Sequence, residues 1–261
     1  MPAYNAERYI EEAISSILNQ SFSDFELIII DDCSTDATWK LIENHKKKDT
    51  RIRTFLNKEN LGIAGNRNKG VSLVTGKYLL WQDADDVSLP ERMQMQFKYL
   101  ERNADVAIVG GYLELFNTHG TIGIRSYPLE DAEMRKCIFR YSPIAQPAAM
   151  LRVESLRMTG TYNLEYPPAE DLDMTFRLGQ NYKLGNIGET LIRYRVSDNS
   201  ATFTSLRKME ISTLKIRRKY WSSSAYEKTL RDLIYNLFHL ISIWIVPAKF
   251  KIRLFNKFRN T

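Results

Sequence analysis

Three carboxylates lie within four residues of this chain, in the segment 81–87, WQDADDV. They are Asp83, Asp85 and Asp86, and the apolar run before them, 77–81, predicts a buried strand. Mg²⁺ and Mn²⁺ take oxygen ligands and keep open positions for substrate phosphates. The cluster therefore favours a divalent-cation site. A helix cap before Pro90 is the alternative, but it accounts for one carboxylate, such as Asp86, and not for three.

The surrounding segments alternate between helix and strand. Apolar residues recur at helical spacing in some segments, and short apolar runs predict strands in others. This alternation indicates an α/β protein with βαβ units, a parallel sheet and helices on both faces. Ligands of such sheets bind beyond the carboxyl ends of the strands, where Asp31-Asp32 and Asp85-Asp86 both fall. The helices are expected at 7–20, 38–45, 64–74 and 90–101, and the strands at 25–30, 52–56, 78–81 and 106–116.

Composition and charge exclude several classes of protein. The 261 residues, 44% of them hydrophobic, suffice for one domain with an extension. The two cysteines indicate neither a zinc site nor a disulfide framework, and no signal peptide is visible, so we expect a cytoplasmic protein. Residues 207–261 hold thirteen Lys and Arg against three acidic residues, so residues 1–206 carry about −4 of the net +6. That part lacks a basic groove, and we expect no nucleic-acid partner.

Five segments, in this order, resemble the family 2 glycosyltransferases of the GT-A fold. The resemblance covers about residues 1–200 and implies a Rossmann-like, mostly parallel sheet. It also implies an inverting, metal-dependent transfer from a nucleotide-diphosphate sugar, with a UDP-sugar as the expected donor, in cell-surface polysaccharide synthesis. The segments are PAYNAE (2–7), FELIIIDDCSTD (25–36), NLGIAGNRNKG (60–70), TGKYLLWQDADD (75–86) and EDLDM (170–174).

The residues that the resemblance leads us to expect at the donor site match the first three segments. Pro2 and Tyr4 belong to the first, where the tyrosine is expected to stack on the base, and packing over the sheet end is the alternative. Asp32 matches the carboxylate that binds the base, although it could also cap the turn after its strand. Arg67 could reach the diphosphate or the uridine-like group, and a solvated surface position is the alternative.

The resemblance also assigns the metal and the acceptor side. Asp86 is the expected ligand of Mn²⁺ or Mg²⁺, Asp85 a ribose or metal partner, and Asp83 a further candidate ligand. Asp171 matches the catalytic base, which takes the proton of the acceptor hydroxyl as that oxygen attacks the anomeric carbon. Glu170 is expected to bind or support the substrate. Both of these acids could instead complement the dipole of the helix that they begin.

Some positions depart from the family pattern. Cys33 stands where glycine is usual, Gln146 stands where a histidine often precedes the proline, and no histidine lies near Ser197. In similar proteins that last histidine contacts the metal or the diphosphate; Asp198 or water could take its place, or the metal could be bound more weakly. In similar enzymes a strand of five or six apolar residues precedes PAYN in the middle of the sheet. We therefore expect a first strand that is missing or truncated, and a start site upstream of Met1.

Residues 207–261 are expected to form a basic, amphipathic helical tail after a catalytic domain of residues 1–206. Polar residues interrupt the apolar run 229–246, and Pro247 stops it short of the roughly 20 residues that span a bilayer. Basic and apolar residues alternate over 247–260, which suits an anionic membrane surface; packing on the catalytic domain is the alternative. The interrupting residues are Asp232, Asn236 and His239.

A tail of this kind predicts a peripheral protein on the inner face of the cell membrane, acting on a glycan or lipid-linked acceptor. Two other functions remain open. One is a non-catalytic nucleotide-sugar-binding protein at the membrane, which the short front and the absent histidines would fit. The other is a nucleotidyltransferase, but Asp171 argues for glycosyl transfer, and the amino end shows no glycine-rich, basic triphosphate loop.

Overall fold

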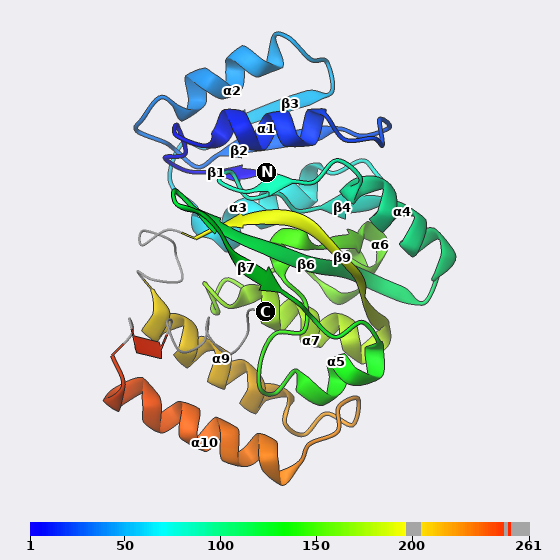
Figure 1. The fold of residues 1–261 in the computed structure, drawn as a ribbon, viewed down its shortest axis with the longest axis vertical. Helices are drawn as coiled ribbons and strands as arrows, with labels where there is room; N and C mark the ends of the chain where they lie inside the picture. The colour runs from blue at the N-terminus through cyan, green and yellow to red at the C-terminus, as the bar shows by residue number, and fades with distance from the viewer. Residues whose placement is uncertain (197–204, 248–249, 252–261) are drawn as a thin grey trace.

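A computed structural model of the chain describes residues 1–196, 205–247 and 250–251. The predictions for Asp198 and for most of 247–260 lie outside the described residues. Figure 1 shows the amino-terminal strands and helices at one end and the last two helices at the other. The elements are β1 (Pro2–Ala3), α1 (Ile10–Leu18), β2 (Leu27–Asp31), α2 (Thr38–Lys46), β3 (Ile52–Leu56), α3 (Gly62–Leu73), β4 (Tyr78–Leu80), β5 (Val87–Ser88), α4 (Arg92–Arg102), β6 (Val106–Asn117), β7 (Gly120–Arg125), α5 (Asp131–Cys137), the 3₁₀ helix η1 (Gln146–Ala148), β8 (Met150–Arg152), α6 (Val153–Thr159), α7 (Glu170–Asn181), β9 (Lys183–Arg195), α9 (Leu206–Tyr220) and α10 (Leu230–Ile245).

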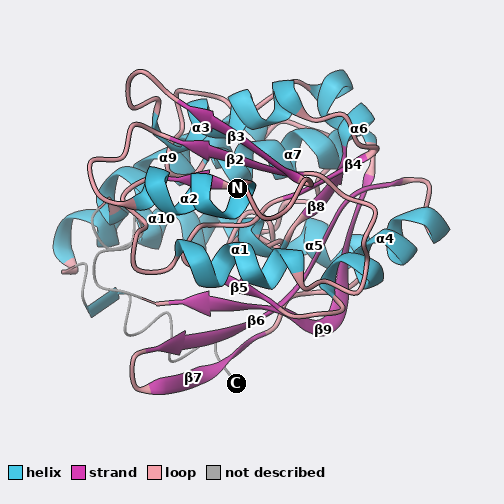
Figure 2. Cartoon of the chain, turned by 90° about the horizontal axis from the view of Figure 1, so that it is seen from above, coloured by secondary structure: helices cyan, strands magenta, loops and turns pink. Residues whose placement is uncertain are grey.

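The first sheet has the order β1-β2-β3, and its strands are parallel. All five residues of β2 are buried, as expected for a strand with both faces covered. Figure 2 shows β2 and β3 between α3 on one side and α1 on the other. The buried face of α1 repeats at helical spacing, with Ile10, Ala13, Ile14 and Ile17. These residues form one core with Leu27 and Ile29 of β2.

The second sheet is mixed. Its order is β4-β8-β6-β9-β5, with β7 paired to β6 beside that path. Only β6 and β9 run parallel within it, so the mostly parallel arrangement expected from the sequence holds for β1–β3 and not here. The reason for β7 is local: two residues join β6 to β7, and a connection this short permits only an antiparallel pair. The α/β architecture itself is confirmed.

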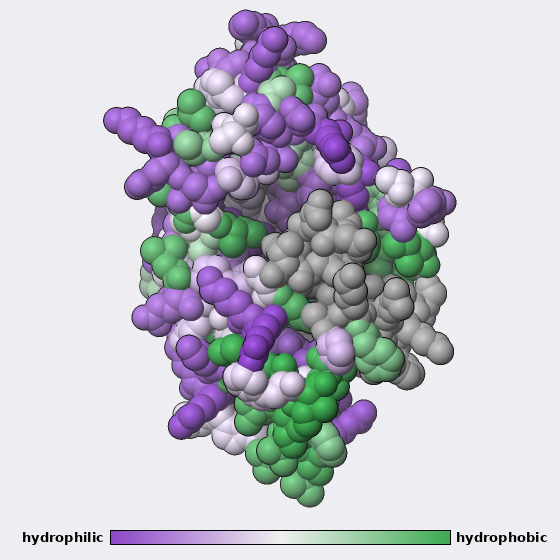
Figure 3. Space-filling view, turned by 90° about the vertical axis from the view of Figure 1, so that its left-hand side faces the viewer, coloured by the Kyte–Doolittle hydropathy of each residue, from purple (hydrophilic) through white to green (hydrophobic). Residues whose placement is uncertain are grey.

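The carboxyl-terminal helices α9 and α10 follow the second sheet. Helix α9 packs on α7, where the rings of Tyr220 and Phe176 stack with centroids 4.7 Å apart. Helix α10 packs on α9 at the lower end of the molecule, where Figure 3 shows hydrophobic side chains gathered on the surface. Across 1–196, 205–247 and 250–251, no helix combines the length and the apolar character that spanning a bilayer requires.

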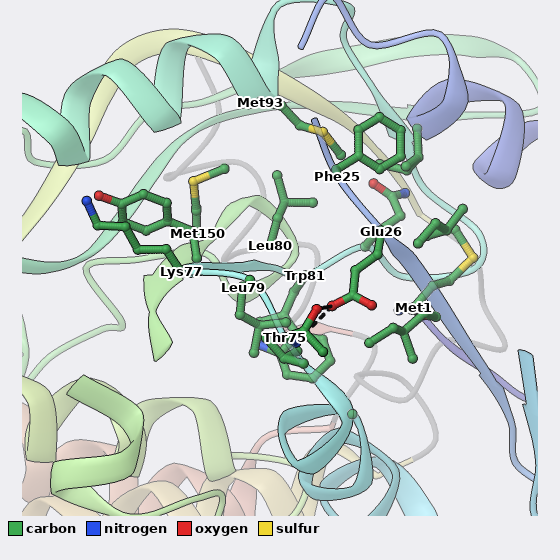
Figure 4. A pocket seen from close by; sticks show the side chains of 18 of the residues that line it. Met1, Phe25, Glu26, Thr75, Lys77, Leu79, Leu80, Trp81, Met93 and Met150 are labelled. Carbon is green, nitrogen blue, oxygen red and sulfur yellow. Dashed lines mark hydrogen bonds between the residues drawn. The ribbon is translucent and has the colours of Figure 1, made fainter. Parts of the chain in front are cut away.

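A cavity of about 510 Å³ lies between β2 and β4 (Figure 4), and no hydrogen-bonded ladder joins the two sheets in the described residues. Side chains from 25–28 and from 75–81 line its two sides, and Met93 and Met150 also contribute. Strand β1 is only two residues long and pairs with Ile30 and Asp31 of β2. The first strand was expected to be missing or short, and β1 is short. Among the predicted site residues, only Pro2 lines this cavity.

Candidate active site

The acidic loop 83–86 follows β4 and presents one unusual carboxylate. Asp86 is 1% exposed, and its Oδ1 accepts a hydrogen bond of 2.8 Å from the backbone N–H of Arg195. Its Oδ2 is buried and has no hydrogen-bond partner among the described residues. Burial, followed by the charges of Asp85 and Asp83, raises the pKa of Asp86 well above its ordinary value. Burial and the Asp83 charge raise the pKa of Asp85 to about 6. A cation would relieve this repulsion.

The acidic loop is held in place by two buried side chains, Gln82 and Arg92. Gln82 Nε2 donates to the backbone oxygens of Asp83 and Asp86, at 3.0 and 2.8 Å. Its Oε1 accepts from Arg92, which is completely buried. The Arg92 guanidinium also donates to the backbone oxygens of Trp81 and Pro147, both at 2.8 Å. The loop is therefore fixed by side chains that the sequence interpretation did not single out.

Replacing Arg92 should therefore destabilise the whole fold. We expect Arg92→Met to lower the free energy of unfolding by about 3 kcal/mol, because it leaves several buried acceptors unpaired. Arg102→Met, at an exposed position of the same helix α4, is the control and should change stability by less than about 0.5 kcal/mol. Urea unfolding of both variants measures the difference, and equal losses would contradict this role of Arg92.

Arg195, the last residue of β9, closes the loop from the opposite side. Its Nε donates to the backbone oxygen of Asp85 at 2.8 Å, and its Nη2 pairs with Glu12 at 2.6 Å. The guanidinium lies 4.1 Å from the ring centroid of Tyr9. Arg195 therefore joins the acidic loop to the segment around α1.

Arg67 of α3 links the acidic loop to the start of α7. It is 4% exposed, so the surface position considered from the sequence is wrong. Its Nη1 lies 2.8 Å from Glu170 Oε1, and its Nη2 lies 3.6 Å from Asp83 Oδ1. The guanidinium also faces the rings of Trp81 and Tyr162, with centroids 5.7 and 5.8 Å away. The ion-pair chain Asp83–Arg67–Glu170 thus brings the strand-end acids and helix α7 into one site.

The three acids at the start of α7 have different environments. Asp171 is partly exposed, and burial raises the pKa of its carboxyl. Its Oδ1 accepts 2.8 Å from the backbone N–H of Leu172. Burial also raises the pKa of Glu170. Asp173 is completely buried and binds Arg177, Lys219 and Tyr220 instead, which ties α7 to α9.

Tyr4 and Asp32 lie at the carboxyl ends of the neighbouring strands β1 and β2. The Tyr4 side chain is 52% exposed. Asp32 is 3% exposed, and its carboxylate accepts from Asn57 Nδ2 at 2.6 Å and from the backbone N–H groups of Leu61 and Gly62 at 2.9 Å. A carboxylate has about four acceptor positions. Asp32 therefore shapes the loop before α3, and these three hydrogen bonds leave one of its acceptor positions unused.

A polar network connects α3 with the loop that contains Tyr162. The Asn68 side chain donates to the backbone oxygen of Tyr162 and accepts from its N–H, at 2.8 and 2.7 Å. The Tyr162 hydroxyl accepts from Trp81 Nε1 at 2.7 Å and also from Gln146. Gln146 thus occupies a buried supporting position in η1. The network fixes the loop around Tyr162 against Trp81, which directly follows β4.

The predicted site residues fall into two groups. Arg67 contacts both Asp83 and Glu170, and Asp85, Asp86 and Asp171 are neighbours of these acids in sequence. Pro2, Tyr4 and Asp32 belong to the first sheet and contact none of these side chains through a hydrogen bond or ion pair given by the described structure. The described residues contain no group of three His, Cys, Asp or Glu side chains arranged to hold a metal. The unpaired Oδ2 of Asp86 still fits a cation that takes one or two protein carboxylates and completes its shell with water and phosphate.

Comparisons with known sequences are consistent with this geometry. A sequence model described as glycosyl transferase family 2 matches residues 1–159. An uncharacterized glycosyltransferase of Haemophilus influenzae is 34% identical over 227 residues, which cover 83% of this chain and 70% of that protein. A putative teichuronic acid biosynthesis glycosyltransferase of Bacillus subtilis, TuaG, is 37% identical over 110 residues, which cover 42% of this chain and 44% of TuaG.

Solved structures share the fold. TarS of S. aureus (residues 1–349), in complex with UDP-GlcNAc, has a TM-score of 0.63 and 18% identity, and the match covers 93% of this chain and 78% of that one. The mannosyltransferase PcManGT of Pyrobaculum calidifontis, in complex with GDP-Man and Mn²⁺, has a TM-score of 0.66 and 15% identity, covering 94% and 68%. At these identities the likeness concerns the arrangement of the elements alone.

Proposed function

This chain belongs to glycosyl transferase family 2 and is a glycosyltransferase, and from that premise we propose that it transfers a sugar from a nucleotide-diphosphate sugar, with inversion at the anomeric carbon. The observation that carries the proposal is the ion-pair chain Asp83–Arg67–Glu170. It holds the acidic loop, which suits a donor diphosphate, beside the helix that carries Asp171.

The donor is proposed to lie across the ends of β1, β2 and β4. Tyr4, which is exposed, is suited to stack on the base, and Asp32 keeps an acceptor position for a base N–H. Pro2 sets the direction in which the chain leaves β1 towards Tyr4. A UDP-sugar is the proposed donor, because TarS is described with UDP-GlcNAc and pyrimidine recognition suits Asp32. The GDP-Man of PcManGT makes a GDP-sugar the alternative to test.

Asp86, with Asp85 or Asp83 beside it, would hold Mn²⁺ or Mg²⁺. Such a cation, when bound, neutralises the charge that builds on the departing diphosphate. Arg67 is proposed to act beside it: its pairing with Asp83 positions that carboxylate, and its positive charge lies within the site. The direct diphosphate contact expected for Arg67 is thus proposed together with a positioning role.

Asp171 is the proposed general base. It takes the proton of the acceptor hydroxyl as the hydroxyl oxygen forms a bond to the anomeric carbon, and the bond to the diphosphate breaks with its electron pair leaving on the diphosphate. Glu170 cannot easily share this task, because Arg67 binds its Oε1. No protein nucleophile is required for this direct displacement.

Ligand-induced stabilisation tests the donor site. We expect a UDP-sugar with Mn²⁺ to raise the melting temperature by about 5 °C at saturating concentration, and the sugar without Mn²⁺ to raise it much less. Asp86→Asn should abolish the metal-dependent part, whereas Glu133→Gln, at an exposed position of α5, should keep it. GDP- and dTDP-sugars identify the nucleotide. Sugar transfer without any nucleoside triphosphate separates this function from a nucleotidyltransferase, and stabilisation by the triphosphate alone would contradict the proposal.

The same measurement has a defined pH dependence. The folded pKa of Asp85, about 6, lies above that of an unfolded aspartate, so the metal-free folded state binds the proton more tightly. The contribution of Asp85 to the free energy of unfolding therefore falls as the pH rises through about 6. The gain from Mn²⁺ should accordingly be larger above that pH than below it.

The acceptor and the cellular location belong to the same proposal. The likeness to TuaG supports a role in cell-surface polysaccharide synthesis, with a glycan or lipid-linked acceptor. Residues 1–206 would be the catalytic domain and 207–261 a basic tail that associates with an anionic membrane surface from the cytoplasmic side. Helix α9 shares a core with α7, so the tail would begin as an integral part of the fold.

A further inference from the structure

Helix α10 has its polarity reversed relative to an ordinary surface helix. The residues on its inner side are Asp232, Asn236 and His239, followed by Ile243. Asp232 forms an ion pair with Arg140 at 2.9 Å. The three polar residues, which interrupt the apolar run in the sequence, all point at the protein in the structure. The apolar residues are therefore left on the other side.

The inner polar residues are well bound. Asn236 Nδ2 donates to the backbone oxygen of Phe139 at 2.9 Å. His239 lies 3.4 Å from Glu210 and 3.2 Å from Arg217, both of α9. Thr229 and Asp232 form a capping box at the amino end. These contacts fix the rotation of α10 about its axis, so its outward face is determined by the structure.

The outward face of α10 is apolar along its whole length. At about 100° per residue, the exposed apolar residues cover a continuous arc of roughly 160° without a polar side chain. Their exposed fractions lie between 45% and 73%. Figure 3 shows the resulting hydrophobic surface at the lower end of the molecule. We call this surface the α10 ridge, and it consists of Leu230, Leu233, Ile234, Leu237, Phe238, Leu240, Ile241, Trp244 and Ile245.

We propose that the α10 ridge inserts into the surface of an anionic lipid bilayer, with the helix lying in the plane of the membrane. A contiguous surface of nine large, exposed apolar side chains marks an interaction site rather than a water-facing surface. A 16-residue amphipathic helix with such a face suits the boundary between headgroups and acyl chains. The inference deepens the membrane association proposed above, on which it rests, and assigns it to described residues.

The charges around the α10 ridge favour lipid over a second copy of the chain. Residues 205–247 contain eight Lys and Arg against three acidic residues. Arg207 is exposed and lies 4.0 Å from the ring centroid of Trp244, within the ridge, and Arg231 is exposed on α10 itself. These cations would attract anionic headgroups. Two copies joined through the ridge would bring the same positive charges together. A tryptophan beside an arginine is also typical of a membrane interface.

Vesicle flotation of the full chain tests the proposal. Wild-type protein should float with vesicles of phosphatidylcholine mixed with phosphatidylglycerol, and much less with phosphatidylcholine alone. We expect the double variant Leu233→Glu, Phe238→Glu to lower the vesicle-bound fraction about tenfold or more, because both charges fall within the inserted face. Met158→Glu, which charges an equally exposed apolar residue of α6, should bind like the wild type. Equal binding of the double variant would overturn the proposal.

Fluorescence locates the inserted face. Lipids with brominated acyl chains should quench wild-type tryptophan emission, and most of this quenching should be lost in Trp244→Phe, which stays apolar and still binds. The other tryptophans, Trp39, Trp81 and Trp221, lie outside the α10 ridge. Dimerisation in solution that the double variant abolishes, without vesicle binding by the wild type, would assign the ridge to a second copy instead.

The failure of this proposal is distinguishable from failure of the proposed function. The double variant should keep the Mn²⁺-dependent stabilisation by a nucleotide sugar, since the contacts given for α10 are with α9 and with Phe139 and Arg140. Asp86→Asn should lose that stabilisation and keep vesicle binding.

Discussion

Asp86→Ala is expected to reduce sugar transfer by about a thousandfold or more while the protein remains folded. The variant removes the one buried carboxylate oxygen of the acidic loop that has no partner among the described residues. Without it, charge on the leaving diphosphate would lose its main counterion. Burial and the charges of Asp85 and Asp83 already oppose ionisation of Asp86, which partly offsets the loss of its hydrogen bond from Arg195, so the metal-free variant should remain folded.

Steady-state transfer assays with a saturating donor measure the loss, and Glu133→Gln on α5 serves as a control of similar charge change. Asp86→Asn keeps the shape of the side chain and separates charge from packing. If either Asp86 variant retained more than about a tenth of the wild-type rate, the cation would have to be bound elsewhere.

Asp171→Asn should lower kcat by about 10²- to 10⁴-fold and leave donor binding intact. Asp171 works as a base only when ionised, and burial raises the pKa of its carboxyl. In the wild type, kcat/KM should therefore fall as the pH drops through a value above the ordinary aspartate range. The asparagine variant should lose this acid limb, since its remaining activity does not depend on that proton.

Asp173→Asn is the matched control on the same helix. Asp173 binds Lys219 and Tyr220 of α9 as well as Arg177, so its replacement should cost about 3 kcal/mol of stability. At a temperature where that variant is folded, its pH profile should keep the acid limb of the wild type. An acid limb that persists in Asp171→Asn would assign the base to another residue.

The helices and strands next to the candidate active site were predictable from the sequence, because their apolar residues recur at the spacing of a helix or form short continuous runs. Strand β2 at 27–31 lies on the first apolar run, and the acidic loop begins where the apolar run of β4 ends. Helix α7 begins at Glu170, as the acids after a proline-rich loop indicate. Local pattern and local structure agree at these places.

The supports of the acidic loop were not predictable, because they come from distant parts of the chain. Arg195 reaches Asp86 across 109 residues, and no spacing rule connects the two. Arg92 had one local sign: it begins α4, where a cation opposes the helix dipole. The amphipathic helix expected in this region is present as α10, but its rotation about its axis was not predictable, for a related reason. Its three polar residues looked like interruptions, but they share one helical face, and only the packing on α9 shows which face is inside.

The strands form two separate sheets, and this division affects the local stability of each part of the molecule. In the described residues no backbone ladder joins β2 to β4, and Ala84 and Met93 share a hydrophobic core with β2. Segments with fewer backbone ties open more often in local unfolding, and their amides exchange sooner with solvent. Tyr4 and Asp32 follow the ends of β1 and β2 in the first sheet, and Asp86 precedes β5 of the second. A nucleotide sugar that contacts residues of both sheets would bind the folded state alone. The free energy of unfolding would therefore be highest when the donor is bound.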